Sequence, residues 1–345
     1  MIDSSDDRAK VLRGLQILEM IMIDESGLLY AYLLNGKGGG DSLGWEQINK
    51  WQPDQGILWL HLEYSDPLVQ QWVLHESGLD EVIAEALLAE ETRPRSMLSA
   101  NGLLLTLRGI NPNPESDPED MVAVRMWCDG ERIITTRRRR LQAAFELSEA
   151  IKKRAGPCNA GEFVESLTDR MVERMADVVD AIGDDVDSLE EAVMTMESYE
   201  LRPQITELRR HAIGLRRYLA PQREAVARLF SEKVQWLSDL DRSRLRENAD
   251  RTARFVEDLD LARERAVVVQ EELASRLSEK MNRTMYVLSI VATIFMPLGF
   301  LTGLLGVNVG DIPGTEYKGA FVIFCAILVL LVILQVWLFK AKKWM

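Results

Sequence analysis

The chain has 345 residues and a formal net charge of −13, from 41 lysines and arginines against 54 aspartates and glutamates. This negative excess repels nucleic-acid phosphates and favours cations as partners, although an acidic surface most often only confers solubility. The cysteines and histidines are too scattered for a disulfide framework or a zinc site built from local spacing. They are Cys128, Cys158, Cys325, His61, His75 and His211.

Residues 1–160 are predicted to form a mixed α/β domain. Apolar and β-branched runs predict strands at residues 27–34, 57–62, 102–108, 121–128 and 132–136. Helices are predicted at residues 67–75 and 80–89. Turns or surface loops are predicted at residues 36–40 and 111–118, where glycine or proline is frequent.

Four consecutive arginines, residues 137–140, follow the last of these strands. Such a run suggests an anion or nucleic-acid site. It lacks interleaved aromatic residues and belongs to an acidic protein, so a solvated turn or salt bridges between subunits are the favoured interpretations.

Residues 161–283 are predicted to form a helical stalk. Acidic residues spaced by three and four lie on one face of its first helix: Asp177, Asp180, Asp184, Asp187 and Glu191. Apolar residues occupy the other face: Met171, Met175, Val178, Ile182, Val186, Leu189, Val193 and Met196. An amphipathic helix with a solvated acidic face accounts for this pattern. The alternative is a surface that gathers divalent cations, because oxygen ligands suit magnesium and can hold hydrated zinc weakly.

No proline occurs between Pro221 and Pro297, and no glycine between Gly214 and Gly299, so long helices are expected there. A turn at residues 236–242 is predicted to divide the region into two antiparallel helices. Apolar residues at heptad-like spacing mark the second helix: Phe255, Leu259, Ala262, Ala266, Val269 and Leu273. The pattern runs without a breaker into an apolar segment, which predicts one helix from about residue 244 to residue 306.

Two uncharged apolar segments are each long enough to cross a hydrocarbon core of about 30 Å. They predict transmembrane helices at residues 284–308 and 319–339, joined by an external loop at residues 309–318 and followed by a basic tail at residues 340–345. Basic residues flank both helices on the side away from the loop, so the positive-inside rule places both chain ends in the cytoplasm. The acidic N-terminus lacks the apolar core of a signal peptide, which favours a cytosolic first domain.

Continuing the heptad-like spacing through the first apolar segment selects a small or weakly polar face: Asn282, Met285, Ser289, Ala292, Met296, Gly299, Gly303 and Gly306. Plain helix packing is one interpretation, because Gly299 and Gly303 form a GxxxG step. The other is a pore. Two spans per chain cannot enclose an ion path, so a pore requires several copies around an axis.

In such a ring, Asn308 would place amide oxygens at the outer mouth, where they could bind the waters of a hydrated cation. Met285, Leu288 and Met296 would form apolar constrictions that gate by dewetting. The spans hold no carboxylate, which argues against tight coordination of a bare ion midway.

Residues 296–308, which read MPLGFLTGLLGVN, resemble the end of the first transmembrane helix and the Gly-x-Asn signature of the CorA superfamily of divalent-cation channels and transporters. That superfamily typically has methionine where this chain has Val307, and an acidic residue where it has Gly310. Both departures resemble the ZntB branch, the bacterial zinc transporters. Further segments that resemble this branch, at residues 90–95, 105–109 and 117–121, extend the resemblance over essentially the whole chain.

The resemblance implies a funnel-shaped homopentamer in the bacterial inner membrane, with an α/β cytosolic domain followed by a long helical stalk and two transmembrane helices. It implies transport of Zn²⁺, as uptake coupled to protons, and no cofactor. By position, Gly306, Val307 and Asn308 form the signature at the pore entrance. The residues that correspond to a pore lining are Asn282, Met285, Leu288, Ala292, Met296, Gly299 and Gly303.

Magnesium-selective relatives have ion-sensing carboxylates between subunits, and these have no individual match in this chain. The acidic row Asp177, Asp180, Asp184, Asp187 and Glu191 therefore supplies candidates only. A magnesium or cobalt channel is the alternative within the transport class, because a neutral pore face does not strongly prefer one divalent ion.

The alternative from another class is a membrane-anchored cytosolic sensor or scaffold. The small face that continues through the bilayer argues against it, since an anchor needs only hydrophobicity. An enzyme is not expected, because the sequence has no phosphate loop, nucleophile elbow or paired acid and base.

Overall fold

The computed structural model describes residues 27–90, 92–99, 102–111, 116–117, 120–195, 199–231, 234–306 and 317–342. The chain divides into two units, Met1–Gln270 and Glu271–Met345. The first unit contains a seven-stranded sheet with helices on both faces. The second contains two apolar helical segments within its described residues.

The sheet has the strand order β2-β1-β3-β7-β6-β5-β4. Its strands are β1 (Leu28–Leu34), β2 (Gly40–Ser42), β3 (Ile57–Glu63), β4 (Arg95–Ser99), β5 (Gly102–Gly109), β6 (Val122–Cys128) and β7 (Arg132–Arg137). Strands β3 and β7 are parallel, and all other neighbours are antiparallel.

All five strands expected from the sequence are confirmed, with ends that differ by one residue. Strands β2 and β4 were not expected, and both lie at the edges of the sheet. An edge strand is paired on one side only and is often short and polar. The three residues of β2 include Gly40, in what had been expected to be a turn, and β4 begins with the exposed Arg95.

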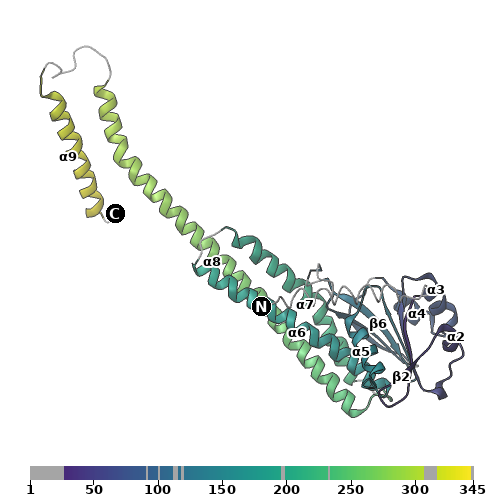
Figure 1. Cartoon of the computed structure of the whole chain (residues 1–345). Helices are drawn as coiled ribbons and strands as arrows, with labels where there is room; N and C mark the ends of the chain where they lie inside the picture. Colours follow the sequence, from purple (N-terminus) through teal and green to yellow (C-terminus); the bar gives the residue numbers. More distant parts are fainter. Residues whose placement is uncertain are drawn as a thin grey trace, which may run out of the picture. The chain divides into compact units, whose positions relative to one another are not determined.

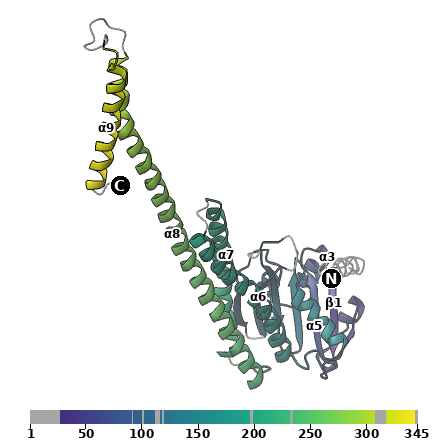
Figure 2. The ribbon, with the colours of Figure 1, turned by 60° about the vertical axis from the view of Figure 1, so that its left-hand side comes forward.

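Helices cover both faces of the sheet (Figure 1). One face packs on α2 (Trp45–Ile48), α3 (Pro67–Gln71), the π-helical turn η2 (Trp72–Glu76) and α4 (Glu81–Leu88); a 3₁₀ turn, η1 (Pro53–Gln55), precedes β3. The other face packs on α5 (Gln142–Lys152), α6 (Ala160–Thr195), α7 (Leu201–Ser231) and the first turns of α8 (Asp239–Leu305). Figure 2 shows α5 and α6 lying over the strands.

The core is divided into two layers by the alternation of side chains along the strands. In β5, Leu103 and Leu105 pack toward α5 and α6, whereas Leu104 packs toward α3 and α4. Phe163 of α6 and Trp59 of β3 are both 0% exposed, and their ring centroids lie 4.9 Å apart. This aromatic contact holds the start of α6 against the centre of the sheet.

His61 lies within this sheet and is 0% exposed. Its Nδ1 is 2.8 Å from Thr135 Oγ1, its ring stacks on Tyr30 at 5.5 Å, and its Nε2 has no hydrogen-bond partner within the described part of the chain. Burial, and then the positive charge of Arg137, hold the pKa of His61 well below its usual range. The imidazole is therefore neutral in the folded protein.

Lowering the pH below about 6.5 is expected to destabilise the first unit, because an unfolded histidine takes up a proton that folded His61 cannot. The contribution of neutral His61 to the free energy of unfolding is fully present above the pKa of an unfolded histidine. It is lost, by up to about 1.4 kcal/mol per pH unit, as the pH falls toward the pKa of folded His61. Thermal midpoints measured between pH 5 and 7.5 test this. A His61→Gln variant should lose that part of the slope, and equal slopes in the two proteins would contradict the prediction.

The arginine run at residues 137–140 forms contacts within the chain. Arg138 binds Glu90 at 2.5 Å, Arg139 binds Asp120, and the Arg140 guanidinium lies 5.2 Å from the centre of the Phe145 ring. Two of these arginines are thus paired with carboxylates at the surface, which fits a solvated turn better than a nucleic-acid site.

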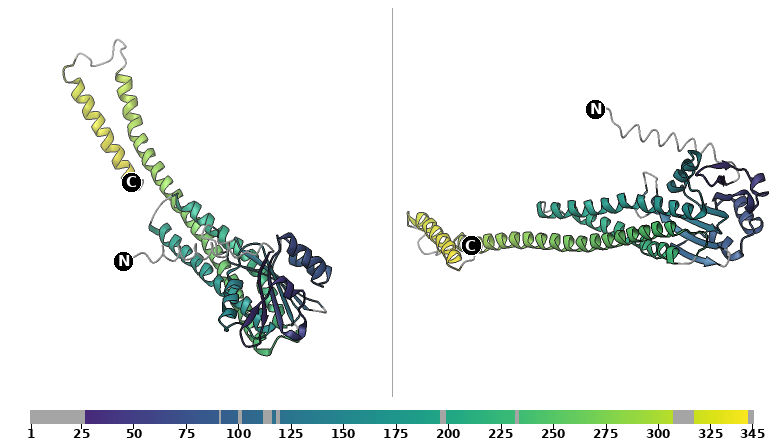
Figure 3. Two further views of the ribbon diagram at one scale, coloured as in Figure 1. Left: turned by 45° about the vertical axis from the view of Figure 1, so that its right-hand side comes forward. Right: turned by 90° about the horizontal axis from the view of Figure 1, so that it is seen from below.

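Helices α6 and α7 run beside the part of α8 that belongs to the first unit (Figure 3). Ion pairs join α8 to both neighbours: Arg265 binds Asp187 at 2.5 Å and Glu190 at 2.6 Å on α6, and Arg216 of α7 binds Asp260 at 2.6 Å. Six of the eight apolar residues expected on the covered face of α6 are buried, whereas Val178 is only partly buried; Val172 and Val179 are buried as well. Met196 lies outside the described residues.

The break between α7 and α8 lies slightly earlier than expected, since α7 ends at Ser231 and α8 begins at Asp239. A reciprocal cap explains the start of α8. The Asp241 carboxylate accepts from the Ser238 backbone N–H at 3.1 Å, and the Ser238 hydroxyl oxygen accepts from the Asp241 N–H at 3.2 Å. From there α8 continues to Leu305 as the single long helix that the sequence predicts.

Candidate ion-conducting face

Two helical segments of the second unit are long and apolar enough to cross a membrane: the last part of α8 and α9 (Ala320–Ala341). The most apolar windows of the two helices have mean hydropathies of 2.1 and 3.0, and none of their residues is buried within the chain. Composition and length thus support the two expected spans. No charged side chain lies between residues 284 and 305 of α8.

Helix α9 packs on one side of this part of α8. The partly buried residues of α8 are spaced as one helical face: Ile290, Ile294, Pro297, Leu298 and Leu301. The partly buried face of α9 has the same kind of spacing: Phe324, Leu328, Leu331, Val332, Gln335, Val336 and Phe339. A groove of ≈ 490 Å³ is lined by both helices, for example by Leu298 and Leu328, and shows where they meet.

The seven expected pore-lining residues all lie exposed in the single chain. The larger ones are 54% (Met285), 63% (Leu288) and 73% (Met296) exposed. In a helix of 3.6 residues per turn, Ala292 and Ile294 point in directions about 200° apart. The expected pore face therefore lies opposite the face that α9 covers.

Glycine keeps this face open near the end of α8. A Cβ atom added to Gly299 or to Gly303 would meet nothing within 4 Å. Gly299 also lies at the margin of the groove next to α9. Such a surface allows another helix to approach closely or leaves room for a water-filled path.

The serine and threonine hydroxyl groups of this segment donate hydrogen bonds within the helix. Ser289 donates to Met285 O at 2.8 Å, Thr293 to Ser289 O at 2.7 Å, and Thr302 to Leu298 O at 2.9 Å. Each hydroxyl oxygen still has a lone pair that can accept a hydrogen bond from water. The serine and threonine donors of this segment can thus lie in lipid without being left unsatisfied.

The Gly-x-Asn signature begins where α8 ends. The Gly306 N–H donates to Thr302 O at 2.9 Å, which closes the last turn of the helix. Val307 and Asn308 lie outside the described residues, as does most of the expected external loop. The placement of an Asn308 collar therefore stays a prediction.

The acidic row of α6 does not form a metal site within one chain. Its members Asp177, Asp180, Asp184, Asp187 and Glu191 are all exposed. Asp187 and Glu190 are held by Arg265, and these hydrogen bonds raise the pKa of that guanidinium. Over the described ranges, no group of three His, Cys, Asp or Glu side chains is arranged to hold a metal ion.

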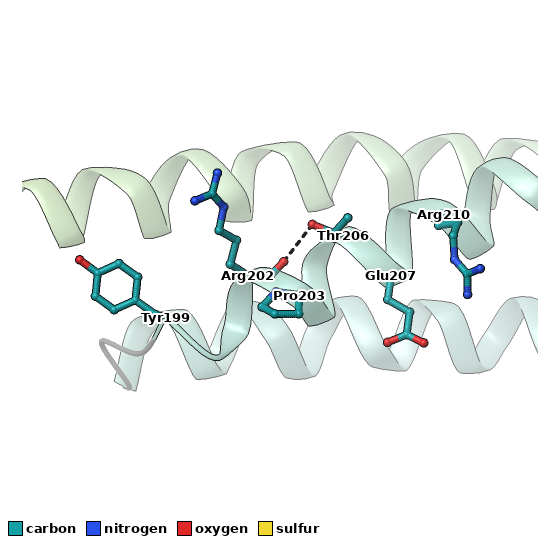
Figure 4. A pocket seen from close by; sticks show the side chains of 6 residues that line it. All are labelled: Tyr199, Arg202, Pro203, Thr206, Glu207 and Arg210. Carbon is teal, nitrogen blue, oxygen red and sulfur yellow. Dashed lines mark hydrogen bonds between the residues drawn. The ribbon is translucent and has the colours of Figure 1, made fainter.

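A hollow of ≈ 650 Å³ lies over the first turns of α7 and the turn before them (Figure 4). Its lining consists of Tyr199, Arg202, Pro203, Thr206, Glu207 and Arg210. The Thr206 hydroxyl donates to Arg202 O at 3.0 Å, and Arg210 pairs with Asp117 at 3.7 Å. With one carboxylate beside two guanidinium groups, this hollow is not suited to binding a divalent cation.

A family model described as CorA-like Mg²⁺ transporter protein matches residues 54–342. The divalent cation transporter CmaX of Pseudomonas aeruginosa is 40% identical over 332 residues, which covers 93% of this chain and 98% of CmaX. The zinc transport protein ZntB of Yersinia enterocolitica is 35% identical over 325 residues, which covers 93% of this chain and 97% of that protein.

Two solved structures extend the similarity to the fold. The full-length CmaX structure has a TM-score of 0.80 and 39% identity, and covers 94% of this chain and 100% of that chain. The complete CorA magnesium transporter of Methanocaldococcus jannaschii has a TM-score of 0.75 and 17% identity, and covers 92% of this chain and 99% of that chain. At this identity the second likeness concerns the fold alone, which is an α/β domain followed by a long helix and apolar C-terminal helices.

Proposed function

This chain belongs to the family of CorA-like Mg²⁺ transporter proteins, and we propose that it carries Zn²⁺ into the bacterial cell by uptake coupled to a proton gradient. Divalent-cation transport of the CorA and ZntB type follows from its membership of a family of transporters rather than enzymes. The identity of the ion and its coupling to protons are the proposal. We place the protein in the inner membrane with both ends in the cytoplasm, as its basic flanking residues favour.

The observation that carries the proposal is the exposed face of α8 opposite α9. Small and weakly polar residues such as Ala292 and Gly303 lie on it, and no other part of the chain covers them in the described structure. One chain with two spans cannot surround an ion, so the face lines a path only when several copies are arranged around an axis. We propose a homopentamer in which this face is turned inward.

Within that ring the large apolar side chains Met285, Leu288 and Met296 would narrow the path and gate it by dewetting. The ion would pass hydrated, because the described part of the spans offers no carboxylate to replace its water. Exposed carboxylates of α6 such as Asp177 and Asp180 would raise the local concentration of cations without forming a closed site.

Zinc is favoured over magnesium by the loop sequence. Val307 and Gly310 depart from the magnesium-type signature in the way that the ZntB branch does. The alternative is a magnesium or cobalt channel, which agrees with the description of the family as CorA-like Mg²⁺ transporter proteins. A relative at 40% identity is named simply a divalent cation transporter, so the choice among ions needs a direct measurement.

Reconstitution in liposomes tests the proposal. Zinc and magnesium entry would be followed with ion-sensitive dyes, with and without an imposed proton gradient, and compared with protein-free liposomes. Zinc flux that the gradient enhances is the expected result. Magnesium flux indifferent to the gradient would replace the proposal by a CorA-like channel, and no flux of either ion would favour a membrane-anchored sensor.

Replacing Asn308 by alanine is expected to impair zinc flux strongly while the oligomer still assembles, because the change removes the amide oxygens of the proposed collar and adds no bulk. Flux and cross-linked oligomer size would be measured on the same preparation. An Asn308→Gln variant, which keeps the amide, should retain part of the flux. Unchanged transport by Asn308→Ala would remove Asn308 from the mechanism.

A further inference from the structure

A polar cavity of ≈ 530 Å³ lies in the first unit, at the end of the sheet where β3 and β7 begin. It is distant in the sequence from the apolar helices and shares no residue with the proposed pore face. Its apolar wall is buried, since Ile48, Leu58 and Trp72 are 5%, 1% and 7% exposed. The cavity thus combines a firmly packed apolar side with a polar opening.

Two tryptophans line the cavity, and their N–H groups are already used within the protein. Trp72 Nε1 donates to Asn49 Oδ1 at 3.2 Å, and Trp51 Nε1 donates to Gly56 O at 3.1 Å. What the two indoles offer a ligand is therefore apolar and π-electron surface. Such surface suits methylene groups and cations that carry them.

The one basic side chain of the cavity lining is neutralised by its neighbours. Arg132 donates from Nη1 to Ser77 O at 2.6 Å, and its Nε lies 3.7 Å from Asp129 Oδ2. The other oxygen of Asp129 accepts from the Arg132 backbone N–H at 2.6 Å. This ion pair leaves no net charge to attract an anion.

Two further carboxylates of the lining are not paired with a base. Glu76 and Glu131 are exposed and come from different elements, the end of η2 and the turn before β7. Glu76 Oε1 accepts only a long hydrogen bond, from Gln71 Nε2 at 3.5 Å. Glu131 has no salt bridge to a base of the described structure. The cavity therefore carries about two uncompensated negative charges at neutral pH.

We propose that this cavity binds an aliphatic diamine or polyamine. Ammonium groups would pair with Glu76 and Glu131, and the methylene chain between them would lie against Trp51 and Trp72. A divalent metal ion fits the site less well, because the described residues gather no three metal-binding side chains here or elsewhere. A diamine with two ammonium groups would match both the negative charge and the apolar surface of the cavity.

Isothermal titration of the full-length protein in detergent tests the proposal, with 1,4-diaminobutane, butylamine and Mg²⁺ as probes. Saturable binding of the diamine is expected, with butylamine at least about tenfold weaker because it engages one carboxylate. Excess Mg²⁺ should leave the diamine affinity within about twofold after ionic strength is matched. No saturable diamine binding, equal binding of the monoamine, or competitive displacement by Mg²⁺ would each overturn the proposal.

Two double variants distinguish diamine binding in this cavity from nonspecific attraction of the diamine to an acidic surface. Glu76→Gln with Glu131→Gln should weaken diamine binding by at least about tenfold. Glu81→Gln with Glu85→Gln makes the same charge change at exposed positions of α4 that do not line the cavity. This control should leave the diamine affinity within about twofold of that of the unsubstituted protein. Thermal midpoints would verify that both variants fold, and an equal loss in both would refute the site.

Discussion

Replacing Ala292 by phenylalanine is expected to reduce zinc flux into liposomes by at least about tenfold. Ala292 lies on the exposed face of α8, about 200° from Ile294, which is on the face that α9 covers. In a ring of copies, one phenylalanine from each chain would meet at the axis and fill the path. A barrier increase of about 1.4 kcal/mol is enough for a tenfold loss, and steric closure exceeds it.

Val291 provides the matched control. It is 46% exposed, it is not an expected pore-lining residue, and it precedes Ala292 by one position, which is about 100° around the helix. Val291→Phe introduces the same side chain at the same depth and should leave flux within about twofold. Cross-linking would report the oligomer of both variants. Equal losses, or no loss in Ala292→Phe, would show that this face does not line the path.

The face that lines the proposed path could be selected from the sequence because its residues are smaller than their neighbours and continue a heptad-like spacing. The packing face of α9 could not, since residues 320–334 of α9 are all apolar and periodicity therefore distinguishes no face among them. Only the structure shows that bulky residues such as Ile294 and Leu298 meet α9. The assignment of the opposite face to a pore stays a prediction.

In the first unit, too, some elements could be predicted from the sequence and others could not. Central strands such as β5 and β6 are buried on both faces, and their near-continuous apolar runs were recognisable. The edge strands β2 and β4 were missed, because short polar strands resemble loops. Helix α5 was not singled out either, although Ala144 and Leu147 pack in the core, since its first turn follows directly on the arginine run.

The acidic row illustrates a limit of patterns along one helix. Spacing placed its five carboxylates on one face correctly, but it could not show that Asp187 is bound by Arg265, which lies far along the chain. Spacing likewise did not reveal the cavity beside Trp51 and Trp72, because its lining comes from several elements. Such sites depend on tertiary contacts between residues that no local pattern joins.

Replacing Phe163 by alanine is expected to destabilise the first unit by about 3–5 kcal/mol. The ring is 0% exposed, and its centroid lies 4.9 Å from that of Trp59. The change leaves a cavity between α6 and the sheet and removes an aromatic contact. Against a typical stability of about 5–15 kcal/mol, this loss should lower the thermal midpoint by roughly 10 °C.

Near-ultraviolet circular dichroism of the full-length protein in detergent would report this midpoint, because Trp59 and Phe163 lie in the core of the first unit. Phe163→Leu, which keeps much of the buried volume, should cost less than about 1.5 kcal/mol. The difference between the two variants then measures the cavity rather than the loss of aromaticity. A midpoint for Phe163→Ala within about 2 °C of the unsubstituted protein would mean that the start of α6 is not held by this contact, and that the other core residues of α6, such as Leu167 and Met171, fix it instead.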